Sequence, residues 1–158
     1  MLSLRVVLFE GETMTFTGVS YLAVLVAAIA GWIVGALYYT ALSAPWMAAQ
    51  GKTKEDFQRE MEGKKGTPAV WLPFVLVFVA ELIMAWVLAG LLGHLGPDQV
   101  TFWNGVVSGA FVWLGFVVTT IAANNMFGMR KVMLSVIDSA HWLIVLVVIG
   151  AVIGLFGG

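Results

Sequence analysis

Residues 70–93 read VWLPFVLVFVAELIMAWVLAGLLG and contain one formal charge, Glu81, close to the centre of the run. About 20 apolar residues, each rising about 1.5 Å, cross a hydrocarbon core of roughly 30 Å, so this stretch predicts a membrane-spanning helix. A carboxyl group at mid-bilayer depth is costly, and ionisable residues found there commonly serve a function. We therefore expect a membrane helix that carries a candidate site at Glu81.

The composition of the whole chain also indicates a membrane protein. Of the 158 residues, 61% are hydrophobic and only 11% are charged, whereas soluble domains carry about 25% charged residues. The lipid bilayer is therefore the predicted partner and no nucleic-acid partner is expected, while the net charge of -1 by itself says nothing about nucleic acid. The chain has no cysteine, which excludes disulfides and thiolate metal sites.

Three further apolar stretches have the length of a membrane span, which predicts a single transmembrane domain over residues 1–158. The expected spans are at about 19–39, 70–93, 102–123 and 132–156. Four spans joined by short turns predict an all-α four-helix bundle in which helices consecutive in the sequence lie side by side. Residues 1–13 are too short to span and lack the cleavage site of a signal peptide, so we interpret them as an N-terminal extension or a peripheral arm.

The loop between the first two spans is expected to contain a short amphipathic helix. Thr53 is followed three residues later by Asp56, which is typical of a capping box, and a helix is predicted over 53–62. Phe57 and Met61 are four residues apart and share one face of that helix. We expect this face to lie near the lipid headgroups.

The distribution of lysine and arginine predicts the orientation of the chain. Five of these residues lie in the 41–69 loop and two in the 124–131 loop, whereas Arg5 alone lies on the other side. Because loops rich in lysine and arginine stay in the cytoplasm, both of these loops are predicted to be cytoplasmic. Both termini are then on the outer side of the membrane.

Pairs of glycines four residues apart occur in three of the four spans. Such pairs let two helices approach closely, and here we expect them to mediate helix packing. The pairs are Gly31 and Gly35, Gly105 and Gly109, and Gly150 and Gly154. The spacing does not say whether the partner helix belongs to the same chain, but we expect a homo-oligomer with at least one pair between chains.

Polar residues within or beside the spans are the candidate binding or coupling residues. Glu81 and His141 lie about 16 Å and about 14 Å from the cytoplasmic ends of their spans, hence at similar depth. Every lysine and arginine is outside the spans, so His141 is the cationic partner that remains for Glu81. The full candidate set is Glu81, His141, Asp138, Asn124, Asn125 and Tyr38.

Simpler structural interpretations of these residues stay open at this point. Glu81 can act as a neutral carboxyl group that hydrogen-bonds another helix. Asp138 can be solvated at the membrane interface near Arg130 and Lys131. His141 can be a buried histidine whose hydrogen bonds are satisfied, rather than a ligand.

Two segments carry a resemblance to a known family. Residues 14–57, MTFTGVSYLAVLVAAIAGWIVGALYYTALSAPWMAAQGKTKEDF, contain a tyrosine pair at 38–39 and a Trp-Met pair at 46–47. Together with DSAHWLIVLVVIGAVIG at 138–154, this pattern resembles the domain of unknown function 1761 family of small bacterial membrane proteins. The resemblance implies a multi-pass protein of the bacterial cytoplasmic (inner) membrane. The family has no established activity, so it assigns no catalytic residue.

The sequence does not support an enzyme, a cofactor site or a metal site. No HExxH, P-loop or CxxC motif occurs. Ser135 and His141 are six residues apart, roughly 9 Å along a helix, which is too far for a nucleophile and its base. Two functional classes remain: a proton- or cation-coupled carrier or channel of unknown substrate that works as an oligomer, and a structural or interaction protein of the cell envelope without transport activity.

Overall fold

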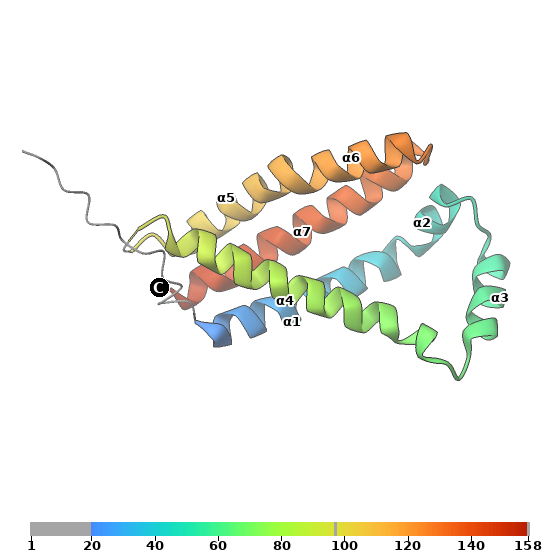
Figure 1. Cartoon of the computed structure of the whole chain (residues 1–158), viewed down its shortest axis with the longest axis horizontal. Coiled ribbons are helices and arrows are strands. Elements are labelled where there is room, and N and C mark those ends of the chain that lie inside the picture. Colours follow the sequence, from blue (N-terminus) through green and yellow to red (C-terminus); the bar gives the residue numbers. More distant parts are fainter. Residues whose placement is uncertain (1–19, 97, 158) are drawn as a thin grey trace, which may run out of the picture.

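The computed structural model describes residues 20–96 and 98–157, and this part of the chain consists of helices joined by turns (Figure 1). This confirms the predicted all-α fold, while the predicted extension at 1–13 lies outside the described residues. The elements are α1 (Tyr21–Ala41), α2 (Ser43–Ala49), α3 (Lys54–Lys64), the 3-10 turn η1 (Pro68–Val70), α4 (Leu72–Gly93), α5 (Phe102–Val112), the π-helical turn η2 (Trp113–Val117), α6 (Val118–Phe127) and α7 (Val132–Phe156).

Four helical segments are long and apolar enough to cross a membrane. They are α1, α4, the continuous run of α5, η2 and α6, and α7. The third span was expected to end near Ala123, before Asn124 and Asn125, but α6 continues to Phe127. The asparagines fit within the last helical turn because their carbonyls accept hydrogen bonds from the backbone N–H groups of Gly128 and Arg130, at 2.8 and 2.9 Å.

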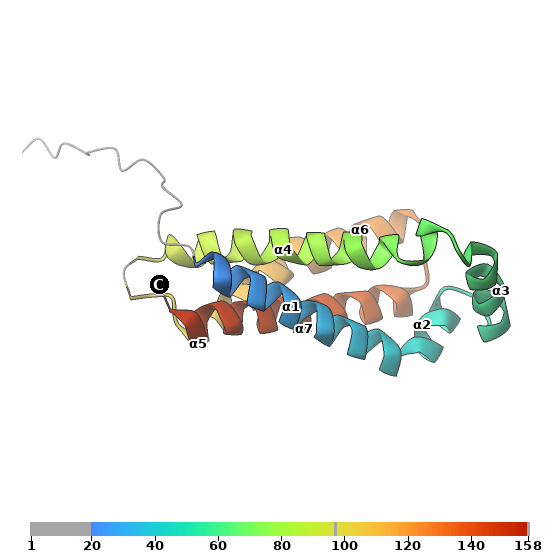
Figure 2. The same ribbon diagram turned by 90° about the horizontal axis from the view of Figure 1, so that it is seen from below.

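The last helix, α7, is the centre of the bundle. It packs against α1 on one side and against α5 and α6 on the other, while α4 packs mainly on α1 (Figures 1 and 2). The expectation that each helix lies beside its neighbours in the sequence is therefore wrong for α4 and α5, which are consecutive spans but share little contact. The first and last spans are close neighbours instead.

The two ends of the bundle differ in character. One end, the loop end, carries α2, α3 and residues 128–131, and the other, the turn end, carries the 94–101 connection (Figure 1). Between mid-bundle and the turn end lies an apolar core contributed by α1, α4 and α7. Its buried members are Val24, Ala27, Ala28, Ala85, Leu88, Ala89, Leu92, Val145, Ile149 and Ile153.

The glycine pairs lie at helix contacts within one chain. A Cβ atom built on Gly105 would overlap the carbonyl oxygen of Gly150, and one built on Gly150 would overlap the carbonyl oxygen of Gly105. In the same way, Gly109 meets the backbone of Leu146 in α7, and Gly154 meets the backbone of Thr101 at the start of α5. On α1, Gly31 packs against Ile149 and Val145 of α7, and Gly35 packs against His141 of α7. All six glycines are buried in contacts within this chain, and the expectation that one pair lies between chains stays a prediction.

The helix α3 begins with the predicted capping box. The hydroxyl oxygen of Thr53 accepts a hydrogen bond from the backbone N–H of Asp56 at 3.1 Å, and the Asp56 carboxylate accepts from the backbone N–H of Thr53 at 3.1 Å. Hydrogen bonds from the Thr53 hydroxyl and backbone N–H to the carboxylate hold the pKa of Asp56 below its ordinary value. The half of the cap that the Asp56 carboxylate makes is therefore strongest when Asp56 is ionised.

Acidification is expected to loosen α3. Because the pKa of Asp56 is lower when the cap is formed, the cap's stabilisation is present above the ordinary carboxyl pKa of about 4 and is lost as the pH falls through the lowered value. Hydrogen exchange of the α3 amides, corrected for intrinsic rates, should show protection that falls on acidification and is weak at every pH in Thr53→Ala. If the Thr53→Ala variant kept full protection at neutral pH, the cap would be irrelevant to α3.

Candidate functional site

Three spanning helices bring one residue each to a common point in the middle of the bundle. Glu81 of α4 is fully buried, and His141 of α7 is 4% exposed. A Cβ atom built on Gly35 of α1 would lie 2.7 Å from Nε2 of His141 and 3.6 Å from Oε1 of Glu81. Both polar atoms therefore border the space that the glycine leaves, and we call these three residues the central cluster.

The polar atoms of the central cluster lack hydrogen-bond partners. Both carboxyl oxygens of Glu81 and Nδ1 of His141 are buried, and the structure gives none of them a partner. Most buried polar groups in proteins are hydrogen-bonded, and exceptions call for an explanation. In hydrocarbon an unpaired carboxylate is especially unfavourable, so the central cluster is the least satisfied part of the described interior.

Aromatic rings enclose His141. The centroid of the Tyr39 ring lies 4.6 Å from that of the imidazole, the Tyr38 ring lies 5.5 Å away and the Trp142 ring lies 4.8 Å away. These rings pack around the imidazole, which is buried. Close packing of this kind leaves the imidazole little room to move.

The two tyrosine hydroxyls have different partners on α7. The hydroxyl of Tyr39 donates to Oδ1 of Asp138 at 2.9 Å, whereas the hydroxyl of Tyr38 donates to the carbonyl oxygen of Ile137, also at 2.9 Å. Tyr39 thus contacts Asp138 through its hydroxyl and His141 through its ring. Tyr39 therefore links Asp138 to the ring of His141, and His141 and Glu81 both border the space that Gly35 leaves.

Helical spacing explains why these residues meet. Gly35 and Tyr39 are four residues apart on α1, and Asp138 and His141 are three apart on α7, so each pair lies on one face of its helix. The α1 face is made of glycine and tyrosine, and the glycine admits the imidazole. Tyr38 was among the candidate residues predicted from the sequence, whereas Tyr39 was not. The four-residue series Gly31, Gly35 and Tyr39 identifies Tyr39 as part of the same face.

The two asparagines do not join the central cluster. The side-chain amide of Asn125 donates to the hydroxyl oxygen of Ser135 at 2.9 Å and links α6 to α7 near the loop end. Asn124 is exposed. The candidate residues therefore do not form one group: Asn125 pairs with Ser135, while Asp138 is linked through Tyr39 to His141.

The π-helical turn η2 contacts α7 close to the central cluster. The indole N–H of Trp113 donates to the carbonyl oxygen of Ser139 at 2.7 Å, two residues before His141. Turns of this type occur often at functional sites. No feature of the sequence predicted this turn.

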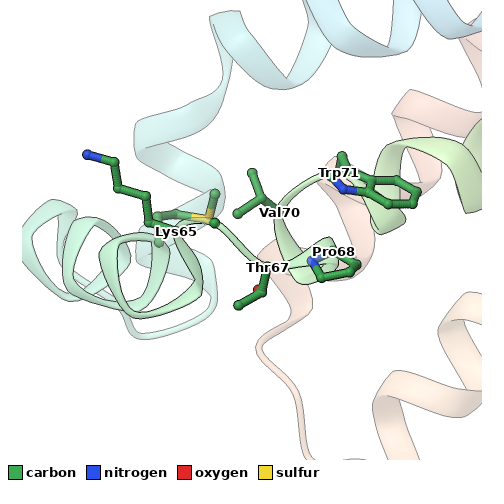
Figure 3. Close-up of a pocket in the computed structure, with 7 residues that line it drawn as sticks. Lys65, Thr67, Pro68, Val70 and Trp71 are labelled. Carbon is green, nitrogen blue, oxygen red and sulfur yellow. The ribbon is translucent and has the colours of Figure 1, made fainter.

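The described cavities lie at the loop end, away from the central cluster. A cavity of about 490 Å³ lies between α3 and the start of α4, with Lys65 on one side and Trp71 on the other (Figure 3). A second, of about 400 Å³, lies along charged residues of α3 and Lys52. Neither cavity borders Glu81 or His141, so the arrangement provides polar atoms at the cluster but no described cavity beside them.

Comparison with known proteins identifies the family. The family model described as "Protein of unknown function (DUF1761)" matches residues 22–154, nearly the whole chain. No curated protein and no solved structure matches the chain. The match confirms the resemblance seen in the residues, and the four apolar helices agree with a membrane protein. The chain therefore belongs to the DUF1761 family of proteins of unknown function.

Proposed function

We propose that this protein is a proton-coupled carrier or channel in which Glu81 takes up and releases the proton. The observation that supports this most directly is the buried carboxyl group without a partner, placed beside a buried imidazole at the meeting point of three helices. Ionisable residues buried within membrane spans commonly mark proton or ion pathways. The proposal involves no enzymatic reaction.

Nε2 of His141 and Oε1 of Glu81 both border the space that Gly35 leaves, and a proton can pass between the imidazole and the carboxyl group when they approach to hydrogen-bond distance. If protonated Glu81 gives its proton to His141, a carboxylate and an imidazolium form and stabilise each other as an ion pair. In the reverse step both groups become neutral, the state that burial in hydrocarbon favours. The cluster can therefore hold a proton in two arrangements without any change in net charge.

The tight packing of the central cluster favours a proton over a larger cation as the species bound there. A single methyl group at Gly35 would already crowd the imidazole at 2.7 Å. A proton needs no cavity, whereas a metal ion or an organic cation needs both volume and several ligands. A larger co-substrate would have to bind elsewhere. We propose that the protein forms a homo-oligomer and that the co-substrate binds between its chains, at surfaces other than the buried glycine faces.

We further propose that the loop end lies in the cytoplasm of a bacterium and that both termini lie outside. Seven of the eight lysines and arginines fall in the loops at 41–69 and 124–131, as expected for cytoplasmic loops. Trp71, which borders the cavity beside α3, stands at the start of α4 and is half-exposed. This is the position at which tryptophan meets the headgroup region.

The alternative function, a structural or interaction protein, has less support. Its expected binding surfaces were the glycine faces, but in the described chain these are occupied by contacts between α1, α5 and α7. A protein with a purely structural role also has no need of a buried carboxyl group without a partner. The transport proposal accounts for that group.

The proposal predicts loss of proton movement in Glu81→Gln. Purified protein in liposomes that contain a pH-sensitive dye would be tested for proton flux under an imposed membrane potential, and for proton release when a panel of small cations is added. The wild type should show one of these signals, Glu81→Gln should abolish it, and Glu62→Gln, which removes an exposed carboxylate of α3, should retain it. Equal signals in wild type and Glu81→Gln would contradict the proposal.

A further inference from the structure

We infer that protons reach Glu81 from one end of the bundle only, the loop end. The side chains of Asp138 and Tyr39 form the route that the protons take. The inference rests on the proposed function, because it concerns the supply of protons to Glu81. The reason is that polar side chains lie between the central cluster and the loop end, whereas the apolar core lies between the cluster and the turn end.

A series of polar side chains leads from the cluster toward the loop end. Asp138 is half-buried and precedes His141 by three residues on α7, or about 4.5 Å along the helix toward the loop end. Its carboxylate accepts the Tyr39 hydroxyl at 2.9 Å, and the Tyr39 ring lies 4.6 Å from the imidazole. Asp138 is thus partly accessible, and Tyr39 connects it to the ring of His141.

The other direction is closed by the apolar core. From Glu81 to the end of α4 at Gly93 is about 18 Å of helix, and the sequence between them has no titratable residue. Ala85 and Leu92 of α4 and Val145 and Ile149 of α7 fill this half of the bundle and are fully buried. Protons cannot cross packed hydrocarbon side chains without polar groups or water, so the turn end is sealed in this conformation.

The titratable groups near Glu81 are few and come from two helices. Helix α1 contributes Tyr38 and Tyr39, and α7 contributes Asp138 and His141. Residues 102–127 of α5, η2 and α6 contain no titratable side chain, and α2 contains none either. The Tyr38 hydroxyl is bonded to a backbone carbonyl of α7, so the route by way of Asp138 uses Tyr39.

A neutral, lipid-soluble carbodiimide can report the protonation of Glu81. It reacts with a protonated carboxylic acid: the carboxyl oxygen bonds to the central carbon, the acid proton moves to a nitrogen, and an adduct forms without loss of any atom. A carboxylate lacks this proton and is not modified. Mass spectrometry of the peptide that contains Glu81 then separates this adduct from those at other carboxyl groups.

The test uses the full chain in sealed liposomes of known orientation, with the pH changed on one side at a time. Lowering the pH on the side of the loop end should raise the rate of Glu81 modification several-fold, and lowering it on the side of the turn end should not. Modification that follows the turn end, or both ends equally, would overturn the inference and leave the proposed function intact. Modification that follows neither side would overturn both.

Matched tyrosine variants test the route itself. Tyr39→Phe keeps the ring beside His141 and removes only the hydroxyl, and it should slow the response of Glu81 to a pH jump at the loop end on the order of 10-fold or more. Asp138→Asn should do the same. Tyr38→Phe, which loses a hydroxyl bonded to the backbone, should respond like the wild type. Equal responses in Tyr39→Phe, Asp138→Asn and the wild type would overturn the assignment of this route.

Discussion

Replacement of Gly150 by alanine is expected to destabilise the bundle by about 3 kcal/mol, the upper part of the range for overpacked interiors. The new methyl group would overlap the carbonyl oxygen of Gly105 on α5. A backbone atom cannot rotate out of the way as a side chain can, so the two helices must separate locally. Because Gly105 makes the reciprocal contact with Gly150, a shift at either residue disturbs both.

Gly115→Ala is the matched control for this effect. Gly115 lies in the span that packs on α7, but a Cβ atom there would have no neighbour within 4 Å. Alanine is generally favoured over glycine inside a helix by about 0.5–1 kcal/mol, so this variant should be as stable as the wild type or slightly more stable. Thermal unfolding followed by circular dichroism in one detergent compares the three proteins. A wild-type unfolding midpoint for Gly150→Ala would show that α5 and α7 do not touch in this way.

Replacement of Gly35 by alanine is expected to abolish the pH response of Glu81 while the protein stays folded. The methyl group would lie 2.7 Å from Nε2 of His141. The imidazole has little room to move because the rings of Tyr38, Tyr39 and Trp142 surround it. Its displacement would separate it from Glu81, and the rate of carbodiimide modification should then no longer follow the pH at the loop end.

Gly31→Ala provides the comparison on the same helix. A Cβ atom at Gly31 would lie 3.2 Å from Ile149 and 3.3 Å from Val145, which are apolar side chains of α7. The crowding at the helix contact is thus similar in kind, but no titratable group is displaced. Gly31→Ala should lose some stability and keep the pH response. Loss of the response in both variants would attribute the effect to helix packing rather than to the central cluster.

The features that the sequence predicts well are those fixed by local chemistry. The apolar runs specify the spans, because a helix without polar groups has to avoid water. The Thr53–Asp56 box specifies the start of α3, since both capping hydrogen bonds are formed between residues three apart. The similar depth of Glu81 and His141 also follows from counting residues along two spans that run in the same direction.

The features that the sequence does not predict depend on which helices meet. Glycine spacing indicates close helix contacts but does not identify the partner, so the contact between Gly105 of α5 and Gly150 of α7 did not follow from it, although the two spans were expected to be neighbours. Tyr38 and Tyr39 are identical residue types next to each other, and their roles differ only because of the rotation of α1 relative to α7. Asn125 and Asp138 belonged to one set of candidate residues, but the Asn125 amide pairs with Ser135.

The backbone contact at Gly105 and Gly150 has a consequence for how the fold responds to temperature. In a bilayer, separation of α5 from α7 replaces protein contacts by lipid contacts and exposes little apolar surface to water. The large heat capacity of unfolding in soluble proteins comes from the hydration of such surface. The heat-capacity change for the association of these two helices is therefore close to zero. The free energy of association then varies nearly linearly with temperature. It has no maximum, and the association does not weaken in the cold.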